Sequence, residues 1–247
     1  MPVFRHGDAL SYFAHIPKCA GTSVERYLIS RFGEIGFYDK TASMRGAAAW
    51  SRTSPQHIDW ASLQTILPAS FLTAVFAVVR HPVARAVSAY QFQIEVEYKI
   101  APETPFSDWL CNQARAFADD PFIMDNHFRP QSDFIPEVCE IFHLEHGLEA
   151  IIPYLDNLVG DEKGPRSIER ANSRAHDKRR VKAAPITPTS QDLTLLQELY
   201  ATDFARFGYV VDAPTPTATQ PKLVPELSAP PRPLNKLTNR IRRGLGY

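Results

Sequence analysis

The chain has little of several features that mark whole classes of protein. Its three cysteines are an odd number at scattered positions, so they form neither a disulfide framework nor a paired zinc motif. No apolar run approaches the ~18 residues that a membrane-spanning helix needs, and no basic stretch followed by an apolar run predicts a signal peptide. Neither sign of charge is in excess, since 27 Lys and Arg balance 27 Asp and Glu, which argues against nucleic acid as the partner. We expect a reduced, cytoplasmic protein.

Proline marks the boundary between two parts of the chain. Seven of its 21 prolines fall within the last 36 residues, where Pro-rich text replaces apolar periodicity. This predicts a folded domain over residues 1–211 and a Pro-rich, basic tail over residues 212–247. Leu234, Leu237 and Ile241 have helical spacing, so the tail ends either in a short basic amphipathic helix that can contact a membrane surface or in a solvated segment.

Strand and helix patterns alternate along residues 1–211. Strands are predicted over 11–16, 71–79 and 137–144, and helices from Thr22, from Pro82, over 106–117, near 148–159 and over 191–207. Thr189 and Asp192 have the spacing of a capping box, and Gly208 offers a helix stop. The run 71–79 is apolar and β-branched, as in a strand covered on both faces. The alternation predicts an α/β fold with a central parallel sheet flanked by helices.

A polar loop, His15-Ile-Pro-Lys-Cys-Ala-Gly-Thr-Ser23, joins the first predicted strand to the first predicted helix. A helix N-terminus presents unpaired N–H groups and the positive end of a dipole, which favours an anion. Gly21 permits close approach of the backbone to a ligand, Thr22 and Ser23 add hydroxyls, and Lys18 adds a positive charge. The composition suits phosphate, but the usual nucleotide loop has Gly-Lys-Ser/Thr in that order, and here the lysine precedes the glycine.

A second polar group follows the strand predicted over 71–79. Arg80 stands at the end of that strand, where its guanidinium can donate two hydrogen bonds to a phosphate. Ser88 comes eight residues later, about two turns along the following helix, and can point toward the same oxygens.

These two segments together resemble the phosphate-binding motifs of the sulfotransferase superfamily. The segment HIPKCAGTS resembles its 5′-phosphosulfate loop, especially that of the carbohydrate (2-O-sulfotransferase-like) branch, and Arg80 with Ser88 resembles its 3′-phosphate motif. The segment NHFRPQ at 126–131 and the helix at 199–209 resemble its central and closing elements, so the resemblance spans most of residues 11–211. It departs at Cys19, where Thr is more usual, and at His81, where Asp or Asn is more usual.

The resemblance implies a P-loop-like three-layer fold and a specific co-substrate. That co-substrate is 3′-phosphoadenosine 5′-phosphosulfate, the product is 3′-phosphoadenosine 5′-phosphate, and no metal is required. The implied donor-binding residues are Pro17, Lys18, Cys19, Ala20, Gly21, Thr22, Ser23, Arg80 and Ser88. Lys18 would also stabilise the charge of the leaving phosphate. The expected acceptor is a hydroxyl of a glycan or glycolipid.

An acceptor hydroxyl needs a base, and His57 is the candidate. It lies between the two phosphate motifs, where the carbohydrate branch has a catalytic histidine, and the ordinary pKa of histidine suits the task. The alternative is a loop histidine that precedes a helix over 59–67. Glu95, Glu97 and His127 are further candidates for the base, while Glu95, His127, Arg129 and Gln131 are candidates for contacts with the acceptor.

Two further expectations concern the surroundings of the phosphate loops. Residues 163–182 carry eight basic side chains against two acidic ones, which form either a basic lid over the co-substrate or a solvated charged run. Asn172-Ser173-Arg174 within this stretch resembles a late element of the family near the nucleotide. Cys19, between Lys18 and a helix N-terminus, is expected to have a lowered thiol pKa and to be alkylated unless nucleotide protects it.

Two other functions remain open from the sequence. One is a non-catalytic module that binds nucleotide or polyanion and lacks turnover. The other is a nucleoside-triphosphate kinase, which the order of the residues in the first loop disfavours.

Overall fold

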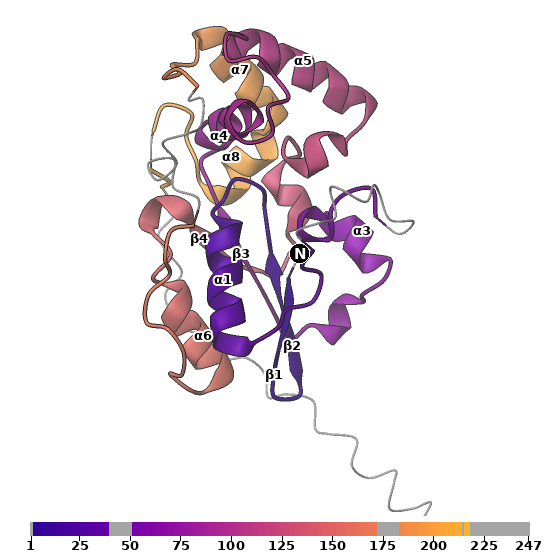
Figure 1. The fold of residues 1–247 in the computed structure, drawn as a ribbon, viewed down its shortest axis with the longest axis vertical. Coiled ribbons are helices and arrows are strands. Elements are labelled where there is room, and N and C mark those ends of the chain that lie inside the picture. Colours follow the sequence, from indigo (N-terminus) through magenta and orange to yellow (C-terminus); the bar gives the residue numbers. More distant parts are fainter. Residues whose placement is uncertain (1, 40–50, 172–182, 214, 218–247) are drawn as a thin grey trace, which may run out of the picture.

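The computed structural model describes residues 2–39, 51–171, 183–213 and 215–217. Its strands are β1 (Val3–His6), β2 (Ala9–Ala14), β3 (Ala74–Val79) and β4 (Glu140–His143). Its helices are α1 (Gly21–Phe32), α3 (Trp60–Gln64), α4 (Pro82–Glu95), α5 (Phe106–Asp119), α6 (Ile151–Val159), α7 (Ser190–Leu199) and α8 (Ala201–Phe207), with short 3₁₀ turns between them. Strands and helices alternate as predicted, in a mixed α/β fold (Figure 1).

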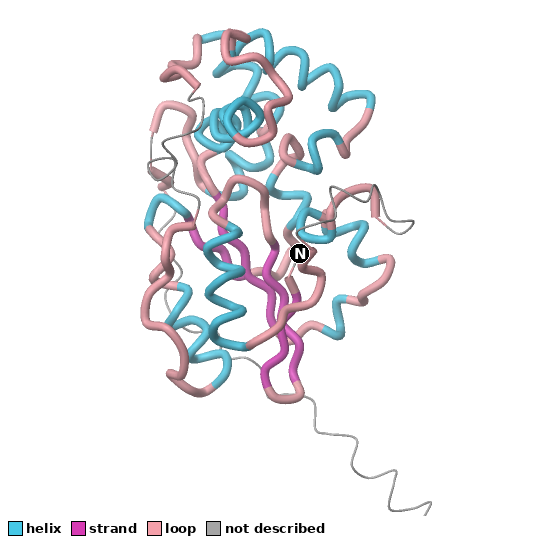
Figure 2. Tube along the Cα trace, in the orientation of Figure 1, coloured by secondary structure: helices cyan, strands magenta, loops and turns pink. Residues whose placement is uncertain are grey.

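The four strands form one sheet in the order β1-β2-β3-β4. β2, β3 and β4 are parallel, as predicted, whereas β1 pairs antiparallel with β2. The sequence analysis missed β1, which is a hairpin arm of only four residues closed by Gly7 at φ 58°. The sheet runs through the lower half of the molecule with helices on either side of it (Figure 2).

Helices cover both faces of this sheet. On one face the rings of Phe13 and Phe76, neighbours in register, lie 4.9 Å apart. Phe32 of α1 stacks on Phe4 at 4.8 Å, and Tyr154 of α6 lies 5.6 Å from Phe76. The opposite face carries Tyr12, which meets Trp60 of α3 at 5.9 Å. Period-two alternation along β2 therefore separates two packing layers.

Several predicted boundaries were wrong by a few residues. β2 ends at Ala14 rather than at residue 16, because the chain turns sharply and Ile16 N–H bonds to the carbonyl of Ala14. β3 begins at Ala74, while Phe71, 64% exposed, belongs to a preceding 3₁₀ turn. β4 covers only 140–143 of the predicted 137–144. α3 covers 60–64 of the predicted 59–67, and α6 starts at Ile151.

The helix predicted over 191–207 is two helices. The capping box of Thr189 and Asp192 is confirmed at the start of α7, and Gly208 ends α8 in the left-handed conformation as predicted. Between them Tyr200 leaves helical geometry at φ −114° and buries its ring, and its hydroxyl donates to the carbonyl of Phe128 at 2.9 Å. A tertiary contact therefore breaks a pattern that local periodicity alone would continue.

No helix within the described part of the chain is both long enough and apolar enough to span a bilayer.

Candidate active site

The two phosphate-motif loops meet at one edge of the sheet. β2 and β3 are parallel, with Ala14 beside Ala77, so the residues after each strand leave the sheet together. Nη1 of Arg80 donates to the carbonyl of Lys18 at 3.2 Å, which joins the loops directly. Segments 62 residues apart in the chain thus form one surface.

A cavity of about 390 Å³ lies at this junction, and below we call it the donor cavity. Its lining includes most of the predicted donor-binding residues: Lys18, Ala20, Gly21, Thr22, Ser23, Arg80 and Ser88. His57, Glu95 and His127 line it as well. The lining does not include Pro17, Cys19, Arg129 or Gln131.

The turn before α1 has an unusual backbone. Lys18 and Ala20 both have left-handed φ values, 69° and 62°, a conformation that costs a non-glycine residue about 1–3 kcal/mol and persists only where the surroundings impose it. At the start of α1 the N–H of Ser23 donates to the carbonyl of Ala20 at 2.9 Å, so only the N–H groups of Gly21 and Thr22 come before the first such bond of the helix. Gly21 is required for a reason that the sequence did not show: a Cβ there would lie 2.0 Å from the imidazole of His15.

Lys18 contributes a largely buried ammonium group to the wall of the donor cavity. Its Nζ lies 3.7 Å from the centroid of the Phe92 ring, and it forms no ion pair with the described residues. Burial, and then the neighbouring positive charge of Arg80, lower the pKa of Lys18 to about 8. An anion bound between Lys18 and Arg80 would relieve this repulsion.

The expectation of a reactive thiol at Cys19 was wrong. The residue is 1% exposed, and burial raises its pKa to about 12. Its Sγ lies 3.3 Å from Oε1 of Gln131 and 3.7 Å from the carbonyl of Pro17, on the protein side of the loop. Desolvation outweighs the helix N-terminus and the neighbouring cations that would lower the thiol pKa.

Gln131 and Arg129 support the loops from behind. The Gln131 side-chain amide accepts from the N–H of Arg80 at 2.9 Å and donates to the carbonyl of Arg80 at 2.8 Å. It is fully buried. Arg129 donates to Asn126 and Asp133. Both residues therefore position other parts of the site, and neither of these candidates for acceptor contacts lines the donor cavity.

Arg85 is a positioning residue that the sequence analysis missed. Its guanidinium is 1% exposed and donates to three carbonyls, those of Pro17, His127 and Arg129, at 3.1, 3.1 and 2.7 Å. It thereby ties the first phosphate loop to the segment that carries His127. The spacing of Arg80 and Arg85 on one strand-helix junction was the available signal.

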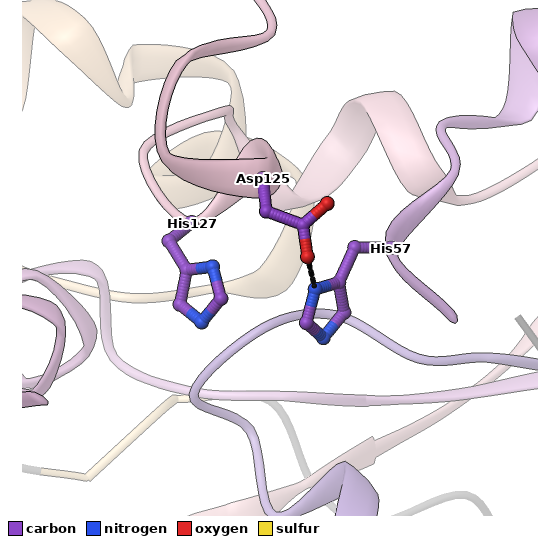
Figure 3. A group of neighbouring side chains, drawn as sticks. All are labelled: His57, Asp125 and His127. Atoms are coloured by element: carbon purple, nitrogen blue, oxygen red, sulfur yellow. Dashed lines mark hydrogen bonds and ion pairs between the residues drawn. The ribbon is translucent and has the colours of Figure 1, made fainter. Parts of the chain in front are cut away.

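His57 forms a dyad with Asp125. Nδ1 of His57 lies 2.7 Å from Oδ2 of Asp125, and Figure 3 shows the other ring nitrogen, Nε2, on the far side of the ring from the carboxylate. Met124, Asp125 and Asn126 have left-handed φ values of 53°, 53° and 62°. This turn aims the carboxylate at His57, and the Asn126 amide fixes it by donating to the carbonyl of His57 at 2.8 Å.

The pairing with Asp125 determines which ring nitrogen of His57 carries the proton. Burial alone would raise the pKa of Asp125, but hydrogen bonds from His57 and Ser54 outweigh it and hold the pKa well below its usual value. The ionised carboxylate accepts, so Nδ1 of His57 is the donor. Nε2 of a neutral His57 is then the unprotonated nitrogen, able to take a proton.

Two further imidazoles flank His57, each 4.9 Å away and edge-on: His15 and His127. His127 stacks on Phe92 and donates from Nδ1 to the carbonyl of Met124 at 2.7 Å, and burial holds its pKa well below the usual value. His127 is therefore neutral, with Nε2 as an acceptor. Ligand atoms of His57, Asp125 and His127 lie within 4.8 Å of one another, a spacing that can also hold a metal ion; Nδ1 of each histidine already has a hydrogen-bond acceptor.

The other candidate bases differ in placement. Glu95 lines the donor cavity, is 5% exposed, and accepts from the N–H of Ala183 at 2.9 Å. Glu97 pairs with Lys99 at 3.1 Å. Ala171 lines the same cavity and donates to Oγ of Ser23. The basic stretch between these contacts, including Asn172-Ser173-Arg174, lies outside the described residues.

Two more cavities adjoin the donor cavity. One, of about 410 Å³, shares His15, Thr22 and His57 with it. The other, of about 490 Å³, lies beside Arg80 and is bounded by apolar side chains, among them Val83, Leu144 and Val211.

Comparison with protein families gives one match. The model of the sulfotransferase family matches residues 6–210. No curated protein and no solved structure matches the chain.

Proposed function

This chain belongs to the sulfotransferase family, and we propose that it transfers a sulfuryl group from 3′-phosphoadenosine 5′-phosphosulfate to a hydroxyl of a carbohydrate-type acceptor. The proposal includes a P-loop-like three-layer fold over residues 1–211 and a place in the 2-O-sulfotransferase-like branch. One observation carries it: Lys18, the N-terminus of α1, Arg80, Ser88 and a carboxylate-oriented His57 surround a single cavity.

The donor would be held by its two phosphate groups. Lys18 and the first N–H groups of α1 suit the 5′-phosphosulfate, because both direct positive charge at the same point. Arg80 and Ser88 suit the 3′-phosphate. The apolar cavity beside Arg80, with Val83 and Leu144 in its wall, suits the purine.

The transfer is an in-line displacement. The acceptor oxygen forms a bond to sulfur while the bond between sulfur and the 5′-phosphate oxygen breaks, and that oxygen keeps the electron pair. The hydroxyl proton passes to Nε2 of His57, and the products are a sulfate ester and 3′-phosphoadenosine 5′-phosphate. Lys18 stabilises the charge that grows on the leaving phosphate, and Asp125 stabilises the imidazolium that forms on His57.

Donor binding is tested by calorimetric titration with 3′-phosphoadenosine 5′-phosphate. We expect the wild-type chain to bind, and Arg80→Ala to weaken binding by at least about tenfold, because it removes a charged pair of hydrogen bonds. Arg115→Ala, at an exposed position on α5, is the matched control. A folded wild-type chain that does not bind would refute the donor assignment.

Turnover separates an enzyme from a non-catalytic binding module. With radiolabelled donor, a panel of glycoside acceptors and a chelator present, His57→Ala should lower kcat by about 10²- to 10⁴-fold, the usual contribution of a general base. Asp125→Asn should also lower kcat while nucleotide affinity stays near wild type. Unchanged kcat in His57→Ala would remove that residue from the role, and nucleotide binding without transfer to any acceptor would favour the binding module.

A further inference from the structure

The cavity of about 410 Å³ adjoins the donor cavity, and we call it the second cavity. It shares His15, Thr22 and His57 with the donor cavity, and its remaining wall comes from Glu25, Arg26, Tyr38, Asp39, Ser54, Gln56 and Asp125. His57 therefore stands in the wall common to both cavities. A base at such a wall can take a proton from a molecule in one cavity while the displaced group leaves in the other.

The two cavities have opposite charge. In the donor cavity Lys18 and Arg80 outnumber the carboxylate of Glu95. Among the described residues that line the second cavity, three carboxylates stand against one guanidinium: Glu25, Asp39 and Asp125 against Arg26. Glu25 and Asp125 are hydrogen-bonded to the imidazoles of His15 and His57, at 2.6 and 2.7 Å. An anionic ligand would meet repulsion here, whereas the doubly anionic donor meets attraction next door.

An unpaired hydrogen-bond acceptor stands in the wall of the second cavity. Gln56 is 9% exposed, and its Oε1 has no partner among the described residues. A buried carbonyl oxygen without a donor is costly, and a hydroxyl from a ligand would supply the missing donor after a small rotation of the amide. The neighbouring Tyr38 and Thr22 contribute hydroxyls of their own to the lining.

We propose that the second cavity binds the acceptor and that its lining selects an uncharged, hydroxyl-rich molecule, a neutral glycoside, over a carboxylated or sulfated polyanion. This inference rests on the proposed function, because it assigns the cavity to the hydroxyl that receives the sulfuryl group. The acceptor hydroxyl lies at Nε2 of His57, gives its proton to that nitrogen, and attacks the sulfur of the donor held by Lys18. Charge and hydrogen-bonding capacity, rather than shape, decide what enters.

The test compares acceptors that differ at one carbon, C6, which carries a neutral CH₂OH in one member of each pair and a carboxylate in the other. The full-length chain is assayed with the 4-nitrophenyl glycosides of glucose and galactose, and with the glucuronide and galacturonide that replace CH₂OH by carboxylate. We expect kcat/KM for the neutral member of each pair to be higher by about tenfold, the effect of one like-charge contact at the surface of a protein. Equal or better transfer to the uronides overturns the proposal.

Variants connect the preference to the cavity. Gln56→Leu should raise KM for the neutral glycoside by about 3- to 10-fold, the value of one hydrogen bond, with nucleotide affinity unchanged. Gln197→Leu, exposed on α7, is the matched control. Asp39→Asn should reduce the difference in kcat/KM between the neutral and the anionic member of each pair. If Gln56→Leu is unfolded by melting temperature, Tyr38→Phe serves in its place.

The two hypotheses fail in different ways. If the folded wild-type chain does not bind 3′-phosphoadenosine 5′-phosphate, the proposed function itself is refuted. If the nucleotide binds, saturation-transfer NMR in the presence of nucleotide reports whether the neutral glycosides bind to the protein. Nucleotide binding with neither saturation transfer nor product from any neutral glycoside overturns the acceptor assignment and leaves the donor assignment in place.

Discussion

Replacing Gly21 by alanine should damage both the stability and the donor site of this chain. The backbone at Gly21 begins α1 and is not left-handed, so alanine meets no conformational barrier and has the better helix propensity. The new methyl group instead collides with a side chain, since its carbon would lie 2.0 Å from Nε2 and Cδ2 of His15. Any loss of stability in Gly21→Ala therefore measures the steric clash between the new methyl group and His15.

The size of the loss follows from what holds His15 in place. The ring must retreat by about 1.4 Å to reach a tolerable 3.4 Å, yet it is 6% exposed and its Nδ1 lies 2.6 Å from Glu25. Overpacking costs about 1–3 kcal/mol, and a buried carboxylate that loses its partner costs about 1–3 kcal/mol more. A total of about 2–6 kcal/mol lowers the melting temperature by at least about 4 °C in a chain of this size.

Calorimetric unfolding and nucleotide titration measure the two effects. Gly36→Ala is the control, because a Cβ there has its closest contact at an ordinary 3.6 Å from the carbonyl of Val3. The double variant His15→Ala with Gly21→Ala makes room for the methyl, so Gly21→Ala should cost less in that background than in the wild type. A Gly21→Ala chain that melts and binds nucleotide like wild type would refute this reasoning, as would strict additivity in the double variant.

Three further results are expected. Burial lowers the pKa of Lys18 to about 8, and the side chain must be charged to hold an anion. Affinity for 3′-phosphoadenosine 5′-phosphate should therefore fall as the pH rises through 8, by about tenfold between pH 7 and pH 9. The affinity of Lys18→Arg should show no such fall near pH 8. Iodoacetamide at pH 8 should label the exposed Cys111 and leave Cys19 unlabelled, with or without nucleotide. Mass spectrometry identifies the labelled residues, and rapid labelling of Cys19 would contradict its burial. Arg85→Met removes the guanidinium that donates to three buried carbonyls, so it should cost at least about 2 kcal/mol of stability in denaturant unfolding, whereas Arg115→Met should be near neutral.

The parts of the fold that could be predicted are those that local pattern determines. Residues 74–79 are apolar because β3 is covered on both faces, and the capping box at Thr189 satisfies N–H groups within one turn. β1 could not be found in this way, since its four residues alternate too briefly to show a period. The break at Tyr200 depends on a hydrogen bond to the carbonyl of Phe128, which lies 72 residues away in the chain.

The same distinction between local pattern and distant contacts explains which parts of the candidate site could be predicted. Each phosphate motif is a strand end, a loop and a helix start, so residue spacing places its members without knowledge of the fold. The partner of His57 lies 68 residues away in a turn of three left-handed residues, none of them glycine. Asp and Asn tolerate that conformation but do not require it, so residue types alone do not predict the turn. The thiol of Cys19 shows the opposite error, because the reasoning used its neighbours in the chain and omitted its burial.

The contacts behind the cavity connect the proposed donor-binding residues to the proposed base. Arg85 joins the carbonyl of Pro17, in the first phosphate loop, to that of His127, and Gln131 fixes the main chain of Arg80 in the second loop. The segment that carries both contacts begins at Asn126, whose amide holds the carbonyl of His57. A shift of either phosphate loop therefore moves the turn that aims Asp125 at His57. Such rigid coupling is what an in-line transfer requires, because nucleophile, base and leaving group must be aligned at the same moment.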